Sequence, residues 1–299
     1  MADSKEKKKI KLKASNGDVV EVSLLGQDYF GRYEGKELWC PIYSFEALNW
    51  LVKEMQFAVA HTWDQVSLLT GREGCGKSAL GLHIGRGLNP DLSLEQIAFT
   101  QEQFKTLVAE AKPGDTVIMD EAAEAMFAHE WMERGQRDLV KAFLTFRAKR
   151  LQTILILPHQ MLLNKQLRER RVYWWFDVYA KALDNRGYAQ VRKAPLRENP
   201  WRTDIFWDGK FTLRFPSFDS VDKRFWDEYE KFKLEFLDRR LREGHKGRYE
   251  RASDSKLKII RSCKKLADAG WSINQIAQHY EYEARTIKDY LKRGESIGA

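Results

Sequence analysis

The sequence predicts an α/β protein built on a parallel sheet, followed by a small all-α module. Two observations predict the sheet: short apolar runs alternate with helical patterns along residues 60–165, and a glycine-rich turn joins one of these runs to a helix. A third observation predicts the module, because three short amphipathic patterns follow one another after residue 256. The 299 residues, 43% hydrophobic and 31% charged, suffice for one sizeable core and one small additional domain.

Composition and charge indicate a soluble protein from a reducing compartment. The three cysteines, Cys40, Cys75 and Cys263, are far apart and odd in number, which fits neither a disulfide framework nor a C-x-x-C metal site. No apolar run reaches the length of a membrane span, and residues 1–9 lack the apolar segment of a signal peptide. We therefore expect a cytoplasmic protein with no membrane partner. The net charge of +8 favours a polyanionic partner, for which nucleic acid is the natural candidate.

The N-terminal residues 1–44 are predicted to form a β-hairpin extension. Two alternating runs, 10–13 and 19–22, flank an Asn16-Gly17 turn that tolerates positive φ angles. Its lysines either contact a nucleic-acid backbone or form a solvated charged edge that blocks strand pairing. Residues 45–60 follow with the apolar spacing of a helix.

Residues 71–78 read Gly-Arg-Glu-Gly-Cys-Gly-Lys-Ser, which matches the phosphate-binding pattern G-x-x-x-x-G-K-[ST] between a strand at 66–70 and a helix. In such a loop the backbone N–H groups surround the phosphates, Lys77 reaches the terminal oxygens and the Ser78 hydroxyl binds Mg²⁺. The sequence therefore predicts ATP or GTP as the ligand, and the alternative is a plain glycine-rich turn. The predicted nucleotide-binding residues are Gly71, Arg72, Glu73, Gly74, Cys75, Gly76, Lys77, Ser78 and Ala79.

Two capping boxes, at 93–96 and 100–103, bracket a short strand at 97–99. The next strand, 116–120, ends in Asp120 and is followed at once by Glu121. A carboxylate at the end of a buried strand near a phosphate loop can hold Mg²⁺ through a water, and a second one can polarise an attacking water. This pattern indicates a Walker B motif with Ser78 and Asp120 as metal ligands. The alternative is an aspartate that caps a helix.

A helix is predicted at 136–149, before the wholly apolar strand 153–157. Polar residues at the carboxyl end of a parallel strand line the ligand crevice, so His159 and Gln160 are candidates for sensing the nucleotide.

Taken together, these three motifs resemble P-loop ATPases of the HerA/FtsK superfamily, and in particular the zonula-occludens-toxin-like and viral genome-packaging ATPases. The resemblance covers residues 60–165 and implies a three-layer parallel sheet of the additional-strand, catalytic-Glu type, with the sensor strand between the phosphate-loop and Walker B strands. It implies ATP and Mg²⁺ as cofactors. The residues carried over are Lys77, Ser78, Asp120, Glu121 and Gln160.

Family members act as homo-oligomeric rings, usually hexamers, in which an arginine of one subunit completes the neighbour's site. An arginine supplied in trans stabilises charge that develops on the transferred phosphoryl group. The candidates are Arg134, Arg137, Arg147 and Arg150, with Arg137 preferred, and each is alternatively a helix-surface residue.

The second half adds further strands and a long helix to the ATPase domain, which is predicted to span 45–243. Aromatic runs flank a second hairpin turn at 184–187, and their side chains either stack on bases or form core and subunit contacts. A strand at 211–215 and a charged helix at 219–242 follow. The composition of 244–255 predicts a linker.

Residues 256–299 resemble a helix-turn-helix domain, in which Ser272 caps the second helix and the small Ala277 lets the helices cross closely. Such a module binds DNA or contacts another protein. The predicted DNA-binding residues are Arg285, Lys288 and Lys292.

The family resemblance implies an ATP-hydrolysing motor that translocates or packages the double-stranded DNA of a virus, plasmid or mobile element, in the host cytoplasm if viral. The alternative is a DNA-binding regulator or partition protein that uses ATP as a conformational switch. A virion-assembly or filament-export ATPase lacks support, because such relatives usually have a membrane segment.

Overall fold

The computed structural model describes residues 8–33, 36–120, 147–163, 165–194, 208–280 and 283–296. The chain divides into two compact units, Met1–Glu230 and Lys231–Ala299. Unit 1 contains the sheet, and unit 2 contains the last two helices.

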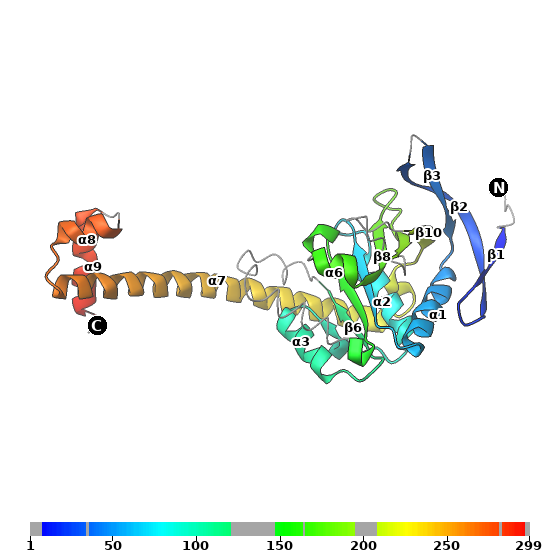
Figure 1. Ribbon diagram of the computed structural model, residues 1–299, viewed down its shortest axis with the longest axis horizontal. Helices are drawn as coiled ribbons and strands as arrows, with labels where there is room; N and C mark the ends of the chain where they lie inside the picture. The colour runs from blue at the N-terminus through cyan, green and yellow to red at the C-terminus, as the bar shows by residue number, and fades with distance from the viewer. Residues whose placement is uncertain are drawn as a thin grey trace. The chain divides into compact units, whose positions relative to one another are not determined.

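Ten strands of the described residues form one mixed sheet (Figure 1) with the order β1-β2-β3-β10-β9-β8-β4-β7-β6-β5. From β8 to β5 every neighbouring pair is parallel, whereas β9 is antiparallel to both of its neighbours. The predicted α/β fold class is confirmed at this level. The strands are β1 (Lys9–Lys13), β2 (Val19–Tyr33), β3 (Lys36–Tyr43), β4 (Gln65–Thr70), β5 (Ile97–Ala98), β6 (Thr116–Met119), β7 (Gln152–Ile156), β8 (Val172–Tyr179), β9 (Tyr188–Lys193) and β10 (Asp208–Arg214).

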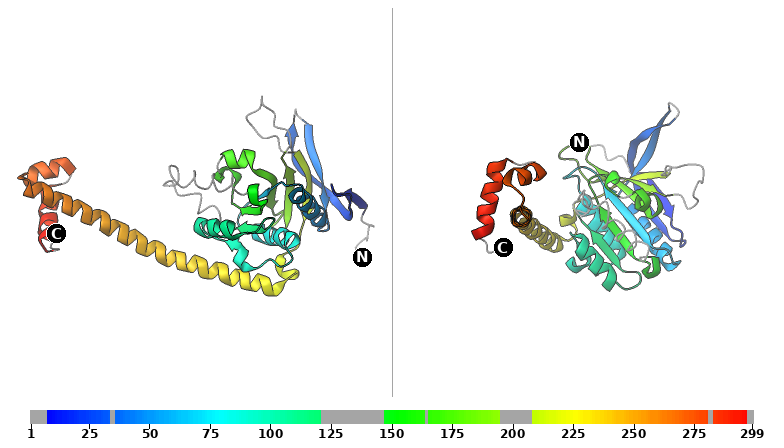
Figure 2. Two further views of the ribbon diagram at one scale, coloured as in Figure 1. Left: turned by 60° about the horizontal axis from the view of Figure 1, so that its bottom comes forward. Right: turned by 60° about the vertical axis from the view of Figure 1, so that its left-hand side comes forward.

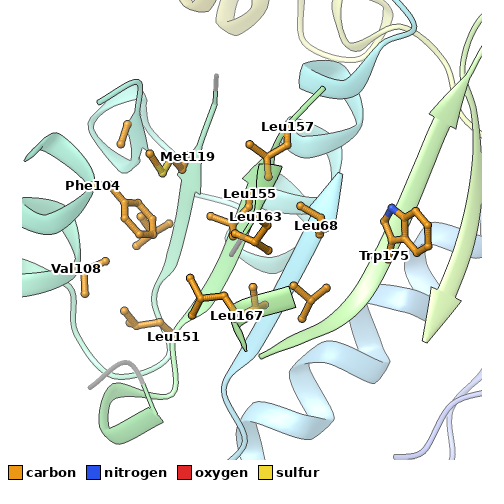
Figure 3. Packing of buried hydrophobic residues seen from close by; sticks show 14 residues of the cluster. Leu68, Phe104, Val108, Met119, Leu151, Leu155, Leu157, Leu163, Leu167 and Trp175 are labelled. Carbon is orange, nitrogen blue, oxygen red and sulfur yellow. The ribbon is translucent and has the colours of Figure 1, made fainter. Parts of the chain in front are cut away.

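Helices cover both faces of the parallel part of the sheet (Figures 1 and 2). On one face, α2 lies so close that a Cβ at Gly81 would be 2.7 Å from Ile156. On the other face, α3 and α6 close a core that contains Leu68 and Leu155 (Figure 3). Every residue of β4, β6 and β7 is buried, as expected for strands covered on both faces. The helices of unit 1 are α1 (Ala47–Ala60), α2 (Lys77–Leu88), α3 (Gln101–Glu110), α6 (Lys165–Arg170) and the first turns of α7 (Lys223–Asp268), with short 3-10 turns η1 (Leu94–Gln96), η3 (Gln160–Leu162) and η4 (Phe218–Ser220).

The predicted N-terminal hairpin is confirmed, since β1 and β2 pair antiparallel around Gly17, which has a φ of 91°. Both capping boxes, at Ser93/Gln96 and Thr100/Gln103, are also present. The hairpin does not stand apart from the parallel sheet, however. The parallel pairing of β3 with β10 makes it one end of the same sheet.

The stretch 244–255, predicted to be a linker, is helical in the structure and belongs to α7. Two glycines in that stretch each disfavour a helix by about 1 kcal/mol, but half of its other residues are good helix formers and it contains no proline. Extending an existing helix needs no new nucleation, which explains why the helical state wins. The predicted domain boundaries at 243 and 256 otherwise stay a prediction.

In unit 2, the end of α7 packs with α8 (Ile273–Tyr280) and α9 (Ala284–Ser296), as the three helical patterns predicted. Cys263, Ile276 and Ile287 form the fully buried centre of this module. Ser272 caps α8 reciprocally with Gln275, whose side chain accepts a hydrogen bond from the Ser272 backbone N–H at 2.8 Å. Among the described residues, no helix is both long and apolar enough to cross a bilayer.

His83 makes the stability of unit 1 depend on pH. Its ring is buried on α2 and shares a hydrogen bond with the Pro216 carbonyl at 3.0 Å. Burial lowers the pKa of His83, and the bond to Pro216 opposes this only in part. The folded chain therefore keeps His83 neutral, while the unfolded chain binds a proton below pH about 6.5. Stability should fall as the pH drops from there through the lowered folded pKa.

We expect urea unfolding of the wild type to shift to lower midpoints between pH 7 and pH 5. The variant His83→Gln should be less stable at pH 7 but show a flatter pH profile. His61→Gln, at an exposed position, is the control and should follow the wild type. Parallel profiles for wild type and His83→Gln would contradict this assignment.

Candidate nucleotide-binding site

The loop at 71–78 joins the end of β4 to the start of α2, as predicted. Gly71, Gly74 and Gly76 all have positive φ angles, of 142°, 75° and 99°. At Gly71 an added Cβ would lie 1.9 Å from the backbone oxygen of Val178 in β8, so only glycine fits there. Gly76 faces the ring of Phe215, which an added Cβ would approach to 3.4 Å. The glycines thus allow both the turn and its close contact with β8 and the residue after β10.

Lys77 is the first residue of α2, and its side chain folds back across the loop. The ammonium group donates hydrogen bonds to the backbone carbonyls of Gly71 at 2.9 Å and Arg72 at 3.0 Å. The ammonium group thereby ties the first two residues of the loop to the start of α2. Of the other predicted contacts, Cys75 and Ala79 are buried, Arg72, Glu73 and Gly74 are exposed, and Gly71, Gly76, Lys77 and Ser78 are half-buried.

Ser78 and Asp120, the two predicted metal ligands, meet in the structure although they lie 42 residues apart. The Ser78 hydroxyl donates to Asp120 Oδ2 at 3.1 Å. Asp120 directly follows β6, is 2% exposed, and its backbone N–H donates to the Ala98 carbonyl at 2.9 Å. A buried carboxylate beside a hydroxyl offers the hard oxygen ligands that Mg²⁺ prefers.

The strand β7 lies between β4 and β6. Its end contacts the loop directly, because the Gly71 backbone N–H donates to the Pro158 carbonyl at 3.2 Å. His159 is exposed, and its Nδ1 accepts a hydrogen bond from the Met161 N–H at 3.2 Å. Gln160 is half-buried and begins η3, two residues beyond the contact with the loop.

Three predicted residues lie outside the described part of the chain: Glu121, Arg134 and Arg137. The other two arginine candidates, Arg147 and Arg150, are described, and both are exposed.

The structure adds two residues that the sequence patterns did not identify. Tyr229, in the second turn of α7, is 2% exposed and donates its hydroxyl to Asp120 Oδ2. Arg186, in the turn between β8 and β9, donates from Nη1 to the Gly74 carbonyl at 3.3 Å. No local signal marks either role, since Tyr229 belongs to an ordinary apolar helix stripe and Arg186 to a hairpin turn.

The strand β8, on the other side of β4, brings a second, half-buried carboxylate to this edge of the sheet. Asp177 pairs in register with Thr70, the residue that precedes the loop. Burial raises the pKa of Asp177, and the charges of Arg192 and His159 oppose this. The guanidinium of Arg192 stacks on the Trp175 ring at 4.3 Å, and Trp175 Nε1 donates to the Thr70 hydroxyl at 2.7 Å. These contacts hold the strand end from which the loop departs.

In unit 2, the three predicted DNA-binding residues are exposed and lie on α9 at positions separated by three and four residues, which places them along one helix face. They are Arg285, Lys288 and Lys292. Among the described residues, no cluster of three or more histidine, cysteine or acidic side chains forms a further metal site.

No protein-family model matches this chain, and no curated protein sequence does.

Proposed function

We propose that this chain is an ATP-hydrolysing motor that translocates or packages double-stranded DNA. The observation that carries the proposal is the meeting of Ser78 and Asp120 next to a glycine loop whose Gly71 and Arg72 carbonyls are bound by the Lys77 ammonium group. A phosphate chain needs backbone donors, one cation at its terminal oxygens and a hydroxyl–carboxylate pair for the metal. Residues 71–78 supply the backbone donors, the cation and the hydroxyl, and Asp120 joins them from 42 residues away, which a plain glycine-rich turn would not require.

Within this proposal the fold is a P-loop NTPase of the additional-strand, catalytic-Glu type, related to the HerA/FtsK superfamily. The position of β7 between β4 and β6 supports it, because this is the order that the resemblance implies. Parallel strands on both sides of β4 also put their carboxyl ends at the same edge as the loop.

Each site residue then has a chemical role. Bound Mg²⁺·ATP supplies the phosphoanhydride bond to be cleaved, with Ser78 and Asp120 holding the ion. Lys77 would give up its hydrogen bonds to the Gly71 and Arg72 carbonyls and bind phosphate oxygens instead, where its charge stabilises the transition state. Glu121 orients the attacking water and Gln160 responds to the γ-phosphate. Arg137 of a neighbouring copy in a ring, a hexamer in this proposal, completes the site.

Double-stranded DNA is the proposed partner because of the net charge of +8 and the exposed basic face of α9. That same face favours a second candidate function, a DNA-bound regulator or partition protein in which ATP is a switch. If α9 acted as a recognition helix in the major groove, unit 2 would bind a specific DNA sequence. A motor instead contacts the phosphate backbone regardless of sequence.

Steady-state ATP hydrolysis separates these functions. We expect wild-type turnover to rise with the length of a random-sequence duplex, because a motor that travels further along each molecule spends less time rebinding. Glu121→Gln should remove this turnover at every duplex length. Glu95→Gln, at an exposed glutamate of η1, is the matched control and should keep it.

Low wild-type turnover that is indifferent to duplex length would contradict the motor. If tight binding to one DNA sequence accompanied it, the ATP switch would be the better account.

A further inference from the structure

Tyr229 lies outside the sequence motifs of the candidate metal site but contacts it directly. Its hydroxyl and that of Ser78 both donate to the same oxygen of Asp120, Oδ2. Two donors on one oxygen restrict rotation of the carboxylate about its Cβ–Cγ bond. A buried carboxylate held in this way presents its lone pairs in a fixed direction. Mg²⁺ requires such fixed ligands because its coordination geometry is close to octahedral.

The Tyr229 ring is itself held firmly. It is 2% exposed and lies between Phe99, 6.2 Å away between ring centroids, and Trp226, 5.5 Å away. Phe99 follows β5, so Tyr229 is wedged against the same end of the sheet that carries Asp120.

The start of α7, one turn before Tyr229, is anchored to the helix that carries Ser78. Asp222 caps the start of α7 by accepting a hydrogen bond from the Phe225 N–H at 3.0 Å. The same aspartate forms an ion pair with Arg86 of α2 at 2.5 Å, and the Arg86 guanidinium stacks on the Phe225 ring at 4.9 Å. Because Ser78 lies in the first turn of α2 and Arg86 in its last, one rigid helix connects both donors of Asp120.

From this arrangement we propose that Tyr229 is a positioning residue for the divalent cation: it orients Asp120 so that metal and nucleotide bind together. The inference rests on the proposed function, because it assigns Tyr229 a role in the same metal–nucleotide site. In this role Tyr229 acts through Asp120, and not on the metal or the nucleotide itself. Its effect should therefore appear in the metal-dependent part of nucleotide affinity and not in binding of the nucleotide alone.

The test is calorimetric titration of ADP into the full chain, once with Mg²⁺ and once with EDTA, for wild type and Tyr229→Phe. The matched control is Tyr179→Phe, because Tyr179 also donates its hydroxyl to a carboxylate, that of Asp28, in the same unit. Both variants lose one hydroxyl and keep the ring. In the wild type Mg²⁺ should tighten ADP binding, and Tyr229→Phe should lose about 10- to 100-fold of that gain. Affinity in EDTA should stay within about twofold of wild type for Tyr229→Phe, the spread expected for measurements of this kind.

Tyr179→Phe should retain the full gain from Mg²⁺. If Tyr229→Phe also retained it, or if its affinity fell equally with Mg²⁺ and with EDTA, Tyr229 would have no positioning role and the inference alone would be overturned. Absence of ADP binding by the wild type would overturn the proposed function together with the inference.

Discussion

Replacing Gly71 with alanine is expected to abolish nucleotide binding and to destabilise unit 1 by about 3 kcal/mol or more. The φ angle of Gly71 is 142°, which residues with a side chain rarely adopt. The new Cβ would also lie 1.9 Å from the Val178 backbone oxygen, and a backbone atom in a buried strand cannot move aside. The loop would have to move away from β8, and the hydrogen bond from the Gly71 N–H to the Pro158 carbonyl would be lost.

Urea unfolding and ADP titration of Gly71→Ala measure the two effects. Gly74→Ala is the control, because Gly74 also has a positive φ but an added Cβ would meet only Arg186 Nη1, at 4.0 Å. We expect the control to lose about 1–2 kcal/mol, the cost of the left-handed backbone alone. Equal stability of the two variants would show that the loop does not pack on β8 as described.

Replacing Lys77 with alanine should reduce ATP turnover by about 10²- to 10³-fold or more, the effect of removing one donor that stabilises transition-state charge. The variant also loses the two hydrogen bonds to the Gly71 and Arg72 carbonyls, so the loop loses its internal brace. Steady-state turnover at saturating ATP measures this loss. Lys11→Ala, at an exposed lysine of β1, should leave turnover unchanged.

If Lys77→Ala kept more than about a tenth of the wild-type turnover, the Lys77 ammonium group would not be the cation at the reacting phosphate. The proposal that ATP is hydrolysed at this loop would then be wrong.

Local patterns predicted much of unit 1. The glycine spacing at 71–78 predicted a loop with its strand and helix because the backbone conformation that it requires is encoded in those residues themselves. The hairpin at Gly17 and the capping boxes at Ser93 and Thr100 were predictable for the same reason, since each is set by a turn or a cap of a few neighbouring residues. The apolar runs of β4, β6 and β7 predicted buried strands, because covered strands need no polar face.

Contacts between distant residues were harder to predict. The pairing of β3 with β10 joins residues 170 positions apart, and the sequence of neither strand indicates which strand it pairs with. Tyr229 and Asp120 are 109 residues apart, and a tyrosine in an apolar stripe has the same spacing whether its hydroxyl reaches a carboxylate or water. The helical state of 244–255 was missed because two glycines and two serines resemble a linker, whereas helix propagation depends on the flanking turns.

The measurement that tests the central claim most directly is calorimetric titration of ATP, with Mg²⁺, into wild type and Lys77→Ala at a temperature where turnover is slow. The account predicts one binding site per chain in the wild type and at least a tenfold weaker affinity in the variant, because the ammonium group that meets the phosphates is gone. Equal affinity in both proteins, or no binding to the wild type, would contradict the assignment of residues 71–78 and Asp120 as a metal–nucleotide site.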